Sequence, residues 1–225
     1  MEPLTRFHYE LQTCPRCLHE ENRVVWDVVD VPADPDLKDR LLKKDLHTYT
    51  CEMCGDLLTV SRPCLYLDRP QATAIFYHPG ETVSAEWMKA LTDLVDSIKK
   101  QRDGAGNKPW RLRLVHSIND LLEKVHVLSA GLDDRILAVV KVALRNRYRE
   151  DEGINFTDLY FLAAGDRSFL FNVNTEEKAA YTLEVETAVY LRAEAALQAD
   201  LPGLDDEWPV VDEAWAVNWL NSRAE

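Results

Sequence analysis

The sequence contains two cysteine pairs of the same spacing, Cys14-Pro15-Arg16-Cys17 and Cys51-Glu52-Met53-Cys54, and these pairs decide the fold of its first third. Two residues separate the cysteines within each pair, and residues 18–50 lie between the pairs. Four cysteines in this arrangement are typical of the tetrahedral zinc sites of zinc ribbons. We therefore predict a zinc ion bound by Cys14, Cys17, Cys51 and Cys54.

Other uses of paired cysteines fit this chain less well. A disulfide would need an oxidising compartment, and a thioredoxin-like motif would not need a second pair. Iron in a rubredoxin-like site uses the same four sulfur ligands. Because four protein ligands leave no position for a reacting water, we expect a structural zinc ion rather than a catalytic one. Gly55 follows the second pair, where the turn often needs a positive φ, whereas Leu18 in the matching position is less suited to it.

The residues around the cysteines predict strands, with one helix between the two pairs. Asp34-Pro35 is a helix start, with aspartate as the cap and proline in the first turn, and Leu37, Leu41 and Leu42 give this helix an apolar face as far as Lys44. The strands are expected at residues 6–12, 23–29, 46–50, 57–67 and 73–78. The first part of the chain is thus predicted to be a zinc ribbon with an inserted helix.

From Ser84 onward, apolar residues recur at helical spacing, with Ser84 as the cap of a helix that includes Ile98. The clearest break in the chain follows at Gly104-Ala105-Gly106-Asn107-Lys108-Pro109. Beyond the break we expect strands at residues 110–115, 157–163, 168–173 and 181–185, and helices at 118–129, 133–148, 187–197 and from about 212. The predicted fold class is α+β, with a zinc-ribbon-like domain at 1–80, a helix and linker at 81–107 and a mixed α/β domain at 108–225.

The charge of the chain is −13, and most of it lies in the last third. Residues 151–225 contain 4 basic and 16 acidic residues, whereas residues 108–150 contain 9 basic and 5 acidic ones. An acidic field of this kind repels nucleic acid and anionic membranes. No apolar run approaches the roughly 20 residues that cross a bilayer, and the N-terminus lacks a signal-peptide pattern. We expect a cytoplasmic protein, which agrees with reduced thiols.

Glu123-Lys124 and Asp133-Asp134-Arg135 form the best polar cluster outside the cysteines. In an enzyme, such residues could act as acid, base and anion clamp around a cleft. In a structural role, they would cap helices and form ion pairs. We favour the structural role, because the sequence contains no nucleophile elbow, phosphate loop or dinucleotide fingerprint.

A second group could bind nucleic acid, because arginines and aromatic residues occur together in the basic segment 108–150. The arginines are Arg111, Arg113, Arg145, Arg147 and Arg149, with Trp110 and Tyr148 beside them. The alternative is that they pair with the acidic last third of the chain, and we favour this alternative.

Several stretches resemble the CpXC domain, a prokaryotic family named for its cysteine motifs. The resemblance covers roughly residues 8–80 and rests on the first cysteine pair, residues 26–42, residues 49–55 and Leu65-Tyr66-Leu67-Asp68. Residues 112–115, 121–125 and 131–136 are similar to the region that follows in longer members. Two departures stand out: Glu52 replaces the usual proline but is not a ligand, and Leu137-Ala138-Val139-Val140 stand where acidic residues are expected. The resemblance implies a metal-binding fold and no known activity.

The function that these observations predict is a zinc-stabilised structural or interaction module that binds another macromolecule, with a protein as the expected partner. Two alternatives stay open. One is an enzyme with a polar site around Glu123, Asp133, Asp134 and Arg135, and the other is a nucleic-acid-binding zinc ribbon that uses residues 108–150.

Overall fold

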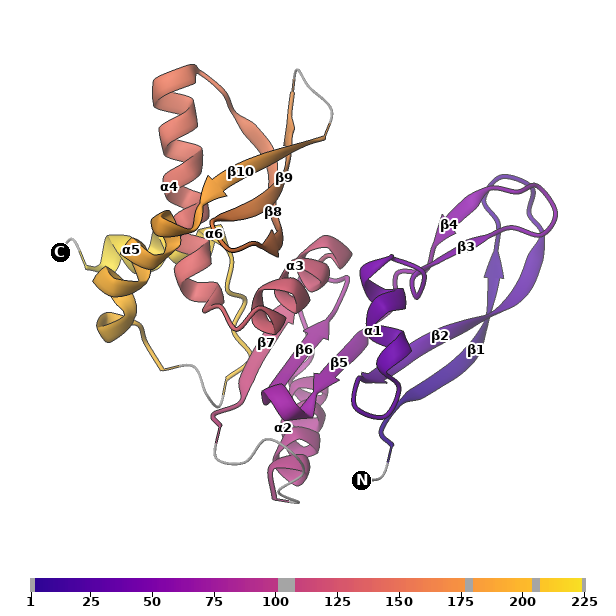
Figure 1. Ribbon diagram of the computed structural model, residues 1–225. Helices are drawn as coiled ribbons and strands as arrows, with labels where there is room; N and C mark the ends of the chain where they lie inside the picture. The colour runs from indigo at the N-terminus through magenta and orange to yellow at the C-terminus, as the bar shows by residue number, and fades with distance from the viewer. Residues whose placement is uncertain (1–2, 101–107, 177–179, 204–206, 224–225) are drawn as a thin grey trace. The chain divides into compact units, whose positions relative to one another are not determined.

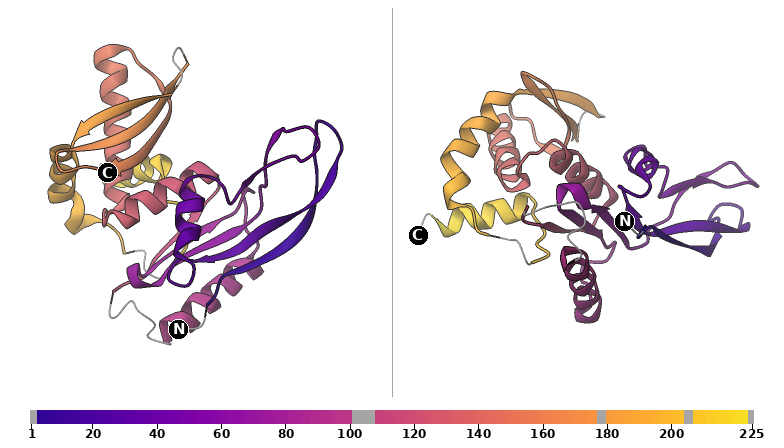
Figure 2. Two further views of the ribbon diagram at one scale, coloured as in Figure 1. Left: turned by 45° about the vertical axis from the view of Figure 1, so that its right-hand side comes forward. Right: turned by 60° about the horizontal axis from the view of Figure 1, so that its bottom comes forward.

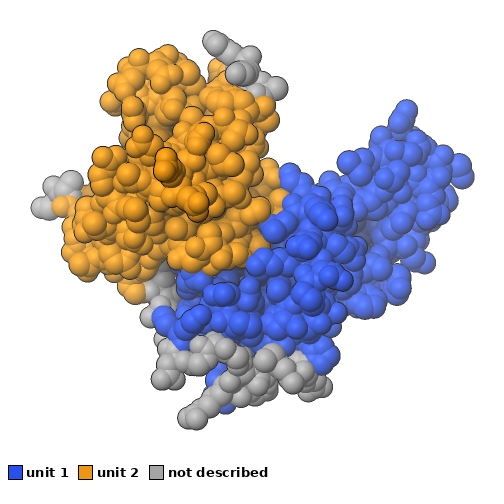
Figure 3. Space-filling model, viewed as in Figure 1, with its two compact units in different colours: residues 1–118 blue, residues 119–225 orange. Residues whose placement is uncertain are grey.

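A computed structural model describes residues 3–100, 108–176, 180–203 and 207–223 of the chain. The chain divides into two compact units, unit 1 (Met1–Ile118) and unit 2 (Asn119–Glu225), which Figure 3 colours separately. From the sequence we expect the boundary earlier, at residues 81–107, of which 101–107 lie outside the described residues. The division in the structure lies later because residues 111–115 form a strand in the sheet of unit 1.

A five-stranded mixed sheet forms the body of unit 1, with the strand order β1-β2-β5-β6-β7 (Figure 1). Its strands are β1 (Arg6–Thr13), β2 (Glu20–Asp30), β5 (Cys64–Asp68), β6 (Thr73–Tyr77) and β7 (Arg111–Val115). The β2–β5 and β6–β7 pairs are parallel, and the other two pairs are antiparallel. Parallel neighbours require crossover connections, which here contain helix α1 (Pro35–Leu42) and helix α2 (Ala85–Lys100). Figure 2 shows the two helices on opposite sides of the sheet.

The centre of this sheet is covered on both faces. Every residue of β5 and β6 is buried, as expected for strands that read as continuous apolar runs. Leu91, Val95 and Ile98 are the buried residues of α2, which confirms the C-terminal part of the helical face predicted from their spacing. Trp87, predicted for the same face, is 52% exposed and stacks on the ring of Phe76. The predicted cap is confirmed as well, because the backbone N–H of Trp87 donates to Ser84 Oγ over 3.3 Å.

Two local predictions in unit 1 are wrong. The stretch at residues 57–67 is not one strand, because β4 (Leu57–Thr59) pairs with β3 (Thr48–Thr50) in a separate hairpin, while β5 joins the main sheet. Residues 60–63 between them form no strand, and Pro63 has no N–H to contribute to a ladder. The other error concerns Asp34, which precedes α1 but makes no side-chain capping hydrogen bond. Helix α1 therefore begins on the fixed φ of Pro35 instead.

His47 lies just before β3 and is only 4% exposed. Its ring meets the ring of Tyr77 edge-on, with centroids 5.8 Å apart, and its Nε2 atom has no hydrogen-bond partner within the described residues. Burial lowers the pKa of His47 to about 4. The unfolded chain, with a histidine pKa of about 6.5, therefore binds this proton more tightly than the folded chain does.

We expect this histidine to make unit 1 less stable in acid. The free energy of unfolding is unaffected by His47 above about pH 6.5, and it falls by on the order of 3 kcal/mol as the pH decreases through the interval down to about 4. Urea unfolding at several pH values should show a weaker pH dependence in His47→Phe than in the wild-type protein. Acid release of bound metal affects both proteins alike, so equal pH dependence in the two would contradict the prediction.

Unit 2 places a three-stranded antiparallel sheet, in the order β10-β9-β8, beside a long helix. The strands are β8 (Phe156–Ala164), β9 (Ser168–Thr175) and β10 (Tyr181–Glu186), and the helices are α3 (Ile118–Ser129), α4 (Asp134–Glu152), α5 (Thr187–Leu197) and α6 (Glu213–Ser222). These elements confirm the ones predicted for this part of the chain. Short 3₁₀ turns occur at Arg69–Gln71 in unit 1 and at Gln198–Asp200 in unit 2.

Helix α4 is buried on two sides. Ile136, Val140 and Leu144 belong to a core cluster that also contains the inward residues of β8 and β9, such as Phe161 and Phe171. Ala138 and Val139 belong to a second cluster with Val211, just before α6, and Ala216 in α6. This double burial accounts for the uninterrupted apolar run at residues 137–140. None of the helices in the described part of the chain has both the length and the apolar character that a membrane crossing requires.

Candidate metal centre

Each cysteine pair lies in a tight turn at the tip of a β-hairpin, the first between β1 and β2 and the second between β3 and β4. In the first turn, the N–H of Leu18 donates to the carbonyl of Cys14 over 2.9 Å. In the second turn, the N–H of Gly55 donates to the carbonyl of Cys51 over the same distance. The residue after each pair has a positive φ, 60° at Leu18 and 73° at Gly55. The two turns, which we call the knuckles, are therefore built alike.

The four sulfur atoms meet in one place. The Sγ atoms of Cys14, Cys17, Cys51 and Cys54 all lie within 4.8 Å of one another. Between the knuckles, the Sγ atoms of Cys14 and Cys54 lie 3.7 Å apart and those of Cys17 and Cys51 lie 3.6 Å apart. A tetrahedral zinc site with Zn–S bonds of about 2.3 Å has sulfur–sulfur edges of about 3.8 Å. The four cysteines are thus close enough to hold a metal ion, and their spacing suits zinc.

The backbone of the first knuckle favours the thiolate form of Cys14, whereas the pKa of Cys17 in the same knuckle is raised to about 12. The backbone N–H of Cys17, followed by that of Arg16, lowers the pKa of the Cys14 thiol to about 7, against the opposing effect of burial. Metals bind the thiolate rather than the thiol, so this lowered pKa makes deprotonation on metal binding easier.

Charged side chains join the two hairpins beside the sulfur cluster. Arg23 on β2 donates to the carbonyl of Thr50 over 3.2 Å and to Glu52 Oε1 over 3.3 Å, and its guanidinium lies 4.7 Å from the centre of the Tyr49 ring. Arg16 in the first knuckle pairs with Asp56 after the second, at 3.5 Å. Arg23 does not stand out in the sequence, because only the folded hairpins bring it to Glu52.

The positive φ of residues 18 and 55 predicts how substitutions at these positions change the affinity for the metal. A side chain in the left-handed region costs roughly 1–2 kcal/mol, and of the two residues that follow the cysteine pairs, Leu18 bears this cost and Gly55 does not. A Cβ atom at Gly55 would meet no atom within 4 Å, so Gly55→Ala adds backbone strain and no clash. We expect Gly55→Ala to weaken metal binding roughly fivefold and Leu18→Gly to leave it unchanged or improve it. Competition with a chromophoric chelator measures both, and weaker binding by Leu18→Gly than by Gly55→Ala would contradict this account.

The predicted polar cluster is engaged in contacts within unit 2. Glu123 is buried, accepts the N–H of Phe161 over 2.7 Å and pairs with Lys141 at 2.9 Å. Asp134 is buried and pairs with Lys124 at 2.8 Å. Through these contacts, the two carboxylates link α3, α4 and β8. Lys124 belongs to the predicted cluster, but its burial and its pairing with Asp134 could not be predicted, and neither could those of Lys141, since charged residues on helices usually face solvent.

The remaining two members of that cluster bind each other. Asp133 caps α4 by accepting the N–H of Arg135 over 2.9 Å, and the Arg135 side chain pairs with the Asp133 carboxylate at 2.6 Å. The capping role of Asp133 predicted from the sequence is thus confirmed. Arg135 also donates to the carbonyl of Pro202, 2.5 Å away. Asp133 and Arg135 thus pair with each other, whereas Glu123 and Asp134 pair with lysines of the neighbouring helix.

The five arginines of the basic segment fall in both units. Arg111 and Arg113 belong to β7 of unit 1, and Arg113 is buried. In unit 2, Arg145 pairs with Glu213 and Arg147 pairs with Asp151, as the ion-pairing alternative predicts. Arg149 donates to Asn146 Oδ1 over 2.9 Å.

Comparison with known proteins identifies the family of the chain. A family model described as CpXC protein matches residues 12–141, which is more than half of the 225 residues and includes all four clustered cysteines. Neither the search of curated proteins nor that of solved structures finds a match. The match agrees with the cysteine spacing and with the resemblance derived from the sequence. The chain belongs to the CpXC protein family.

Proposed function

We propose that this protein is an interaction module whose N-terminal hairpins are held together by a structural zinc ion, and that it binds another protein. The observation that carries the proposal is the convergence of four cysteine sulfur atoms within 4.8 Å. Four thiolates complete the tetrahedral shell of zinc, so a zinc ion here would have no open position for water or substrate. Two hairpins with a knuckle at each tip are also the arrangement of a zinc ribbon.

The surface that we propose for the partner is β1, at the outer edge of the five-stranded sheet. In the described part of the chain β1 pairs only with β2, so its other side offers backbone N–H and C=O groups to a further strand. Phe7, Tyr9 and Leu11 alternate along β1 and are 51%, 66% and 55% exposed. The ring of Trp26 on β2 lies 5.3 Å from that of Phe7 and extends this apolar row.

An extended segment of a partner protein suits this surface. Added strands bind through main-chain hydrogen bonds and gain specificity from side chains at every second position. The exposed row on β1 has that same spacing, and apolar rows left exposed on a protein often mark an interaction site. We therefore propose an extended partner segment with apolar residues at alternate positions.

A protein partner also fits the charge better than nucleic acid does. The chain has a net charge of −13, and Arg145 and Arg147 are in ion pairs with acidic residues. Binding to a polyanion depends on free cationic groups and is opposed by net negative charge. A cytoplasmic location is part of the proposal, because the thiolates must stay reduced to bind zinc.

Selection of random peptides displayed on phage against the zinc-loaded full chain tests this proposal. We expect enrichment of peptides with alternating apolar residues. The variant Tyr9→Lys, which removes an exposed aromatic side chain of β1, should bind these peptides at least about tenfold more weakly. Leu57→Lys is the matched control, because Leu57 is a 70% exposed residue of β4 in the same unit. The proposal fails if no peptide is enriched, or if the two variants bind the selected peptides equally well.

A further inference from the structure

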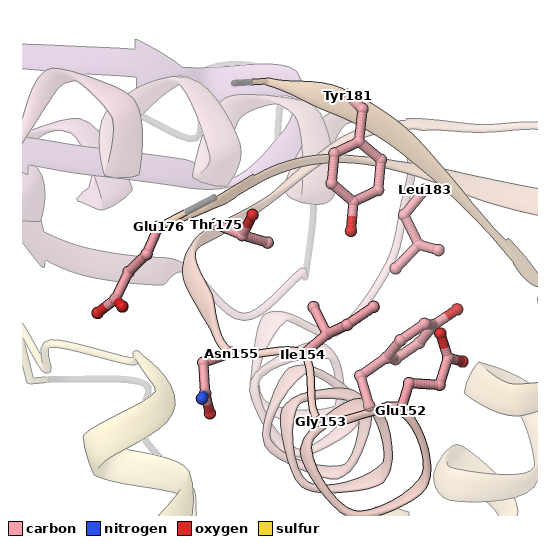
Figure 4. Close-up of a pocket in the computed structure, with 9 residues that line it drawn as sticks. Glu152, Gly153, Ile154, Asn155, Thr175, Glu176, Tyr181 and Leu183 are labelled. Carbon is pink, nitrogen blue, oxygen red and sulfur yellow. The ribbon is translucent and has the colours of Figure 1, made fainter. Parts of the chain in front are cut away.

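A cavity of about 570 Å³ opens at the C-terminal end of α4 in unit 2 (Figure 4). Its described lining comes from the last turn of α4 and the residues after it, from the end of β9 and from the start of β10. This volume lies in the range of small-molecule sites. It is separate from the sulfur cluster, which belongs to unit 1.

One wall of the cavity is aromatic and aliphatic. Tyr148, Ile154, Tyr181 and Leu183 line it, and all four are partly buried residues that pack against the core of unit 2. Figure 4 shows the Tyr181 ring pointing from β10 into the cavity above Ile154. Because the core fixes these side chains from behind, the wall offers a preformed apolar surface and two aromatic rings.

The polar groups around this wall are acidic. Glu152, the last residue of α4, and Glu176, just after β9, both line the cavity and are exposed. The C-terminal end of a helix carries partial negative charge, which adds to that of the carboxylates. None of the described lining residues is basic. The neighbouring Arg149 is not part of the lining and donates to Asn146.

The pKa of Tyr181 reflects its burial first and the nearby negative charge second. Burial raises the pKa of Tyr181 above its ordinary value, and Tyr148 and then Glu152 raise it further. A carboxylate close enough to disfavour a phenolate is also placed to attract a cation bound beside the ring.

We propose that this cavity binds an organic cation, an ammonium group on an apolar stem. The ammonium group pairs with the Glu152 carboxylate and lies against the tyrosine rings, whose faces attract cations. The stem lies on Ile154 and Leu183. A free alkylamine and the side chain of a lysine in a peptide share this chemistry, and the experiment distinguishes them.

Titration calorimetry of the full chain at low salt tests the proposal with three probes: n-pentylammonium, neutral n-pentanol, and a lysine blocked at both its amino and carboxyl groups. We expect the amine to bind at least about fivefold more tightly than the alcohol, as one ion pair of about 1 kcal/mol in water would give. If the blocked lysine binds as tightly as the amine, the natural ligand is a protein side chain; if only the amine binds, the ligand is a free amine. Equal binding of n-pentylammonium and n-pentanol overturns the proposal, and so does a result in which neither n-pentylammonium nor the blocked lysine binds.

Variants locate the bound cation. Glu152→Gln should weaken amine binding about fivefold and leave alcohol binding unchanged. Glu150→Gln is the matched control. It removes the same charge from a residue that is two positions before Glu152 and is not part of the described lining of the cavity. Tyr181→Leu keeps an apolar side chain but removes the ring, and it should weaken amine binding by about two- to fivefold. An equal loss in Glu150→Gln and Glu152→Gln would mean that only overall charge matters, which overturns the proposal. Methyl NMR signals of Ile154 and Leu183 in the wild-type protein give a second test, because they must shift when the amine is added.

Discussion

Replacing Cys51 with serine is expected to abolish stoichiometric zinc binding and to unfold the two hairpins that carry the knuckles. Structural zinc in small domains contributes an apparent binding free energy on the order of 10 kcal/mol, which is comparable to the whole stability of a typical domain. The knuckles belong to separate hairpins and meet through the sulfur cluster and a few partly exposed ion pairs such as Arg16–Asp56. Each of those ion pairs contributes at most about 1 kcal/mol to the free energy of unfolding. Elemental analysis for zinc and near-UV circular dichroism measure the two effects.

The control for this substitution is the fifth cysteine. Cys64 lies in β5 of the same unit and is buried, and burial raises its pKa to about 12. It is not one of the four clustered cysteines, so we expect it to be a packing residue. Cys64→Ala should keep one zinc ion per chain and a native near-UV spectrum. A Cys51→Ser protein with native dichroism and stoichiometric zinc would refute the structural role of the site.

The knuckles could be predicted from the sequence because they are local. Two cysteines separated by two residues fix a turn whatever the rest of the chain does, and the spacing of Trp87, Leu91 and Val95 likewise indicates one helix face. The φ of Leu18 could be inferred only by analogy with Gly55, since leucine by itself argues against a left-handed backbone. The folded arrangement overrides that local preference, because both knuckles present their sulfur atoms to the same place.

The parts that could not be predicted depend on contacts between distant residues. Residues 57–67 read as one apolar stretch, and only the pairing of β4 with β3 and of β5 with β2 divides it. The buried lysines at 124 and 141 belong to the same class, since their carboxylate partners become neighbours only when α3 meets α4. Nothing in a single sequence marks a charged residue as buried when its partner is far along the chain. The clearest example of such a pair lies in unit 1.

Replacing Arg69 with methionine is expected to lower the free energy of unfolding by about 3–5 kcal/mol. Arg69 and Asp30 are 2% and 0% exposed at their side chains, and they form a two-pronged ion pair with distances of 3.1 Å and 2.6 Å. Asp30 ends β2, and it also accepts the backbone N–H of Leu4 over 3.0 Å. Removal of the guanidinium leaves a carboxylate that is buried without its counter-ion, which is the main source of the loss. Urea unfolding of the zinc-loaded protein measures it.

Two further variants separate the loss of a buried charge pair from a general effect of removing arginine. Arg62 pairs with Glu10 in the same unit, but its side chain is 47% exposed, so Arg62→Met should cost less than about 1 kcal/mol. In the double variant Asp30→Asn/Arg69→Met, no unpaired charge remains, and the asparagine oxygen can still accept the N–H of Leu4. The double variant should therefore be more stable than Arg69→Met alone. If the double variant is instead destabilised by the sum of the losses of the two single variants, the two side chains stabilise the fold independently of their charge pairing, which contradicts this account.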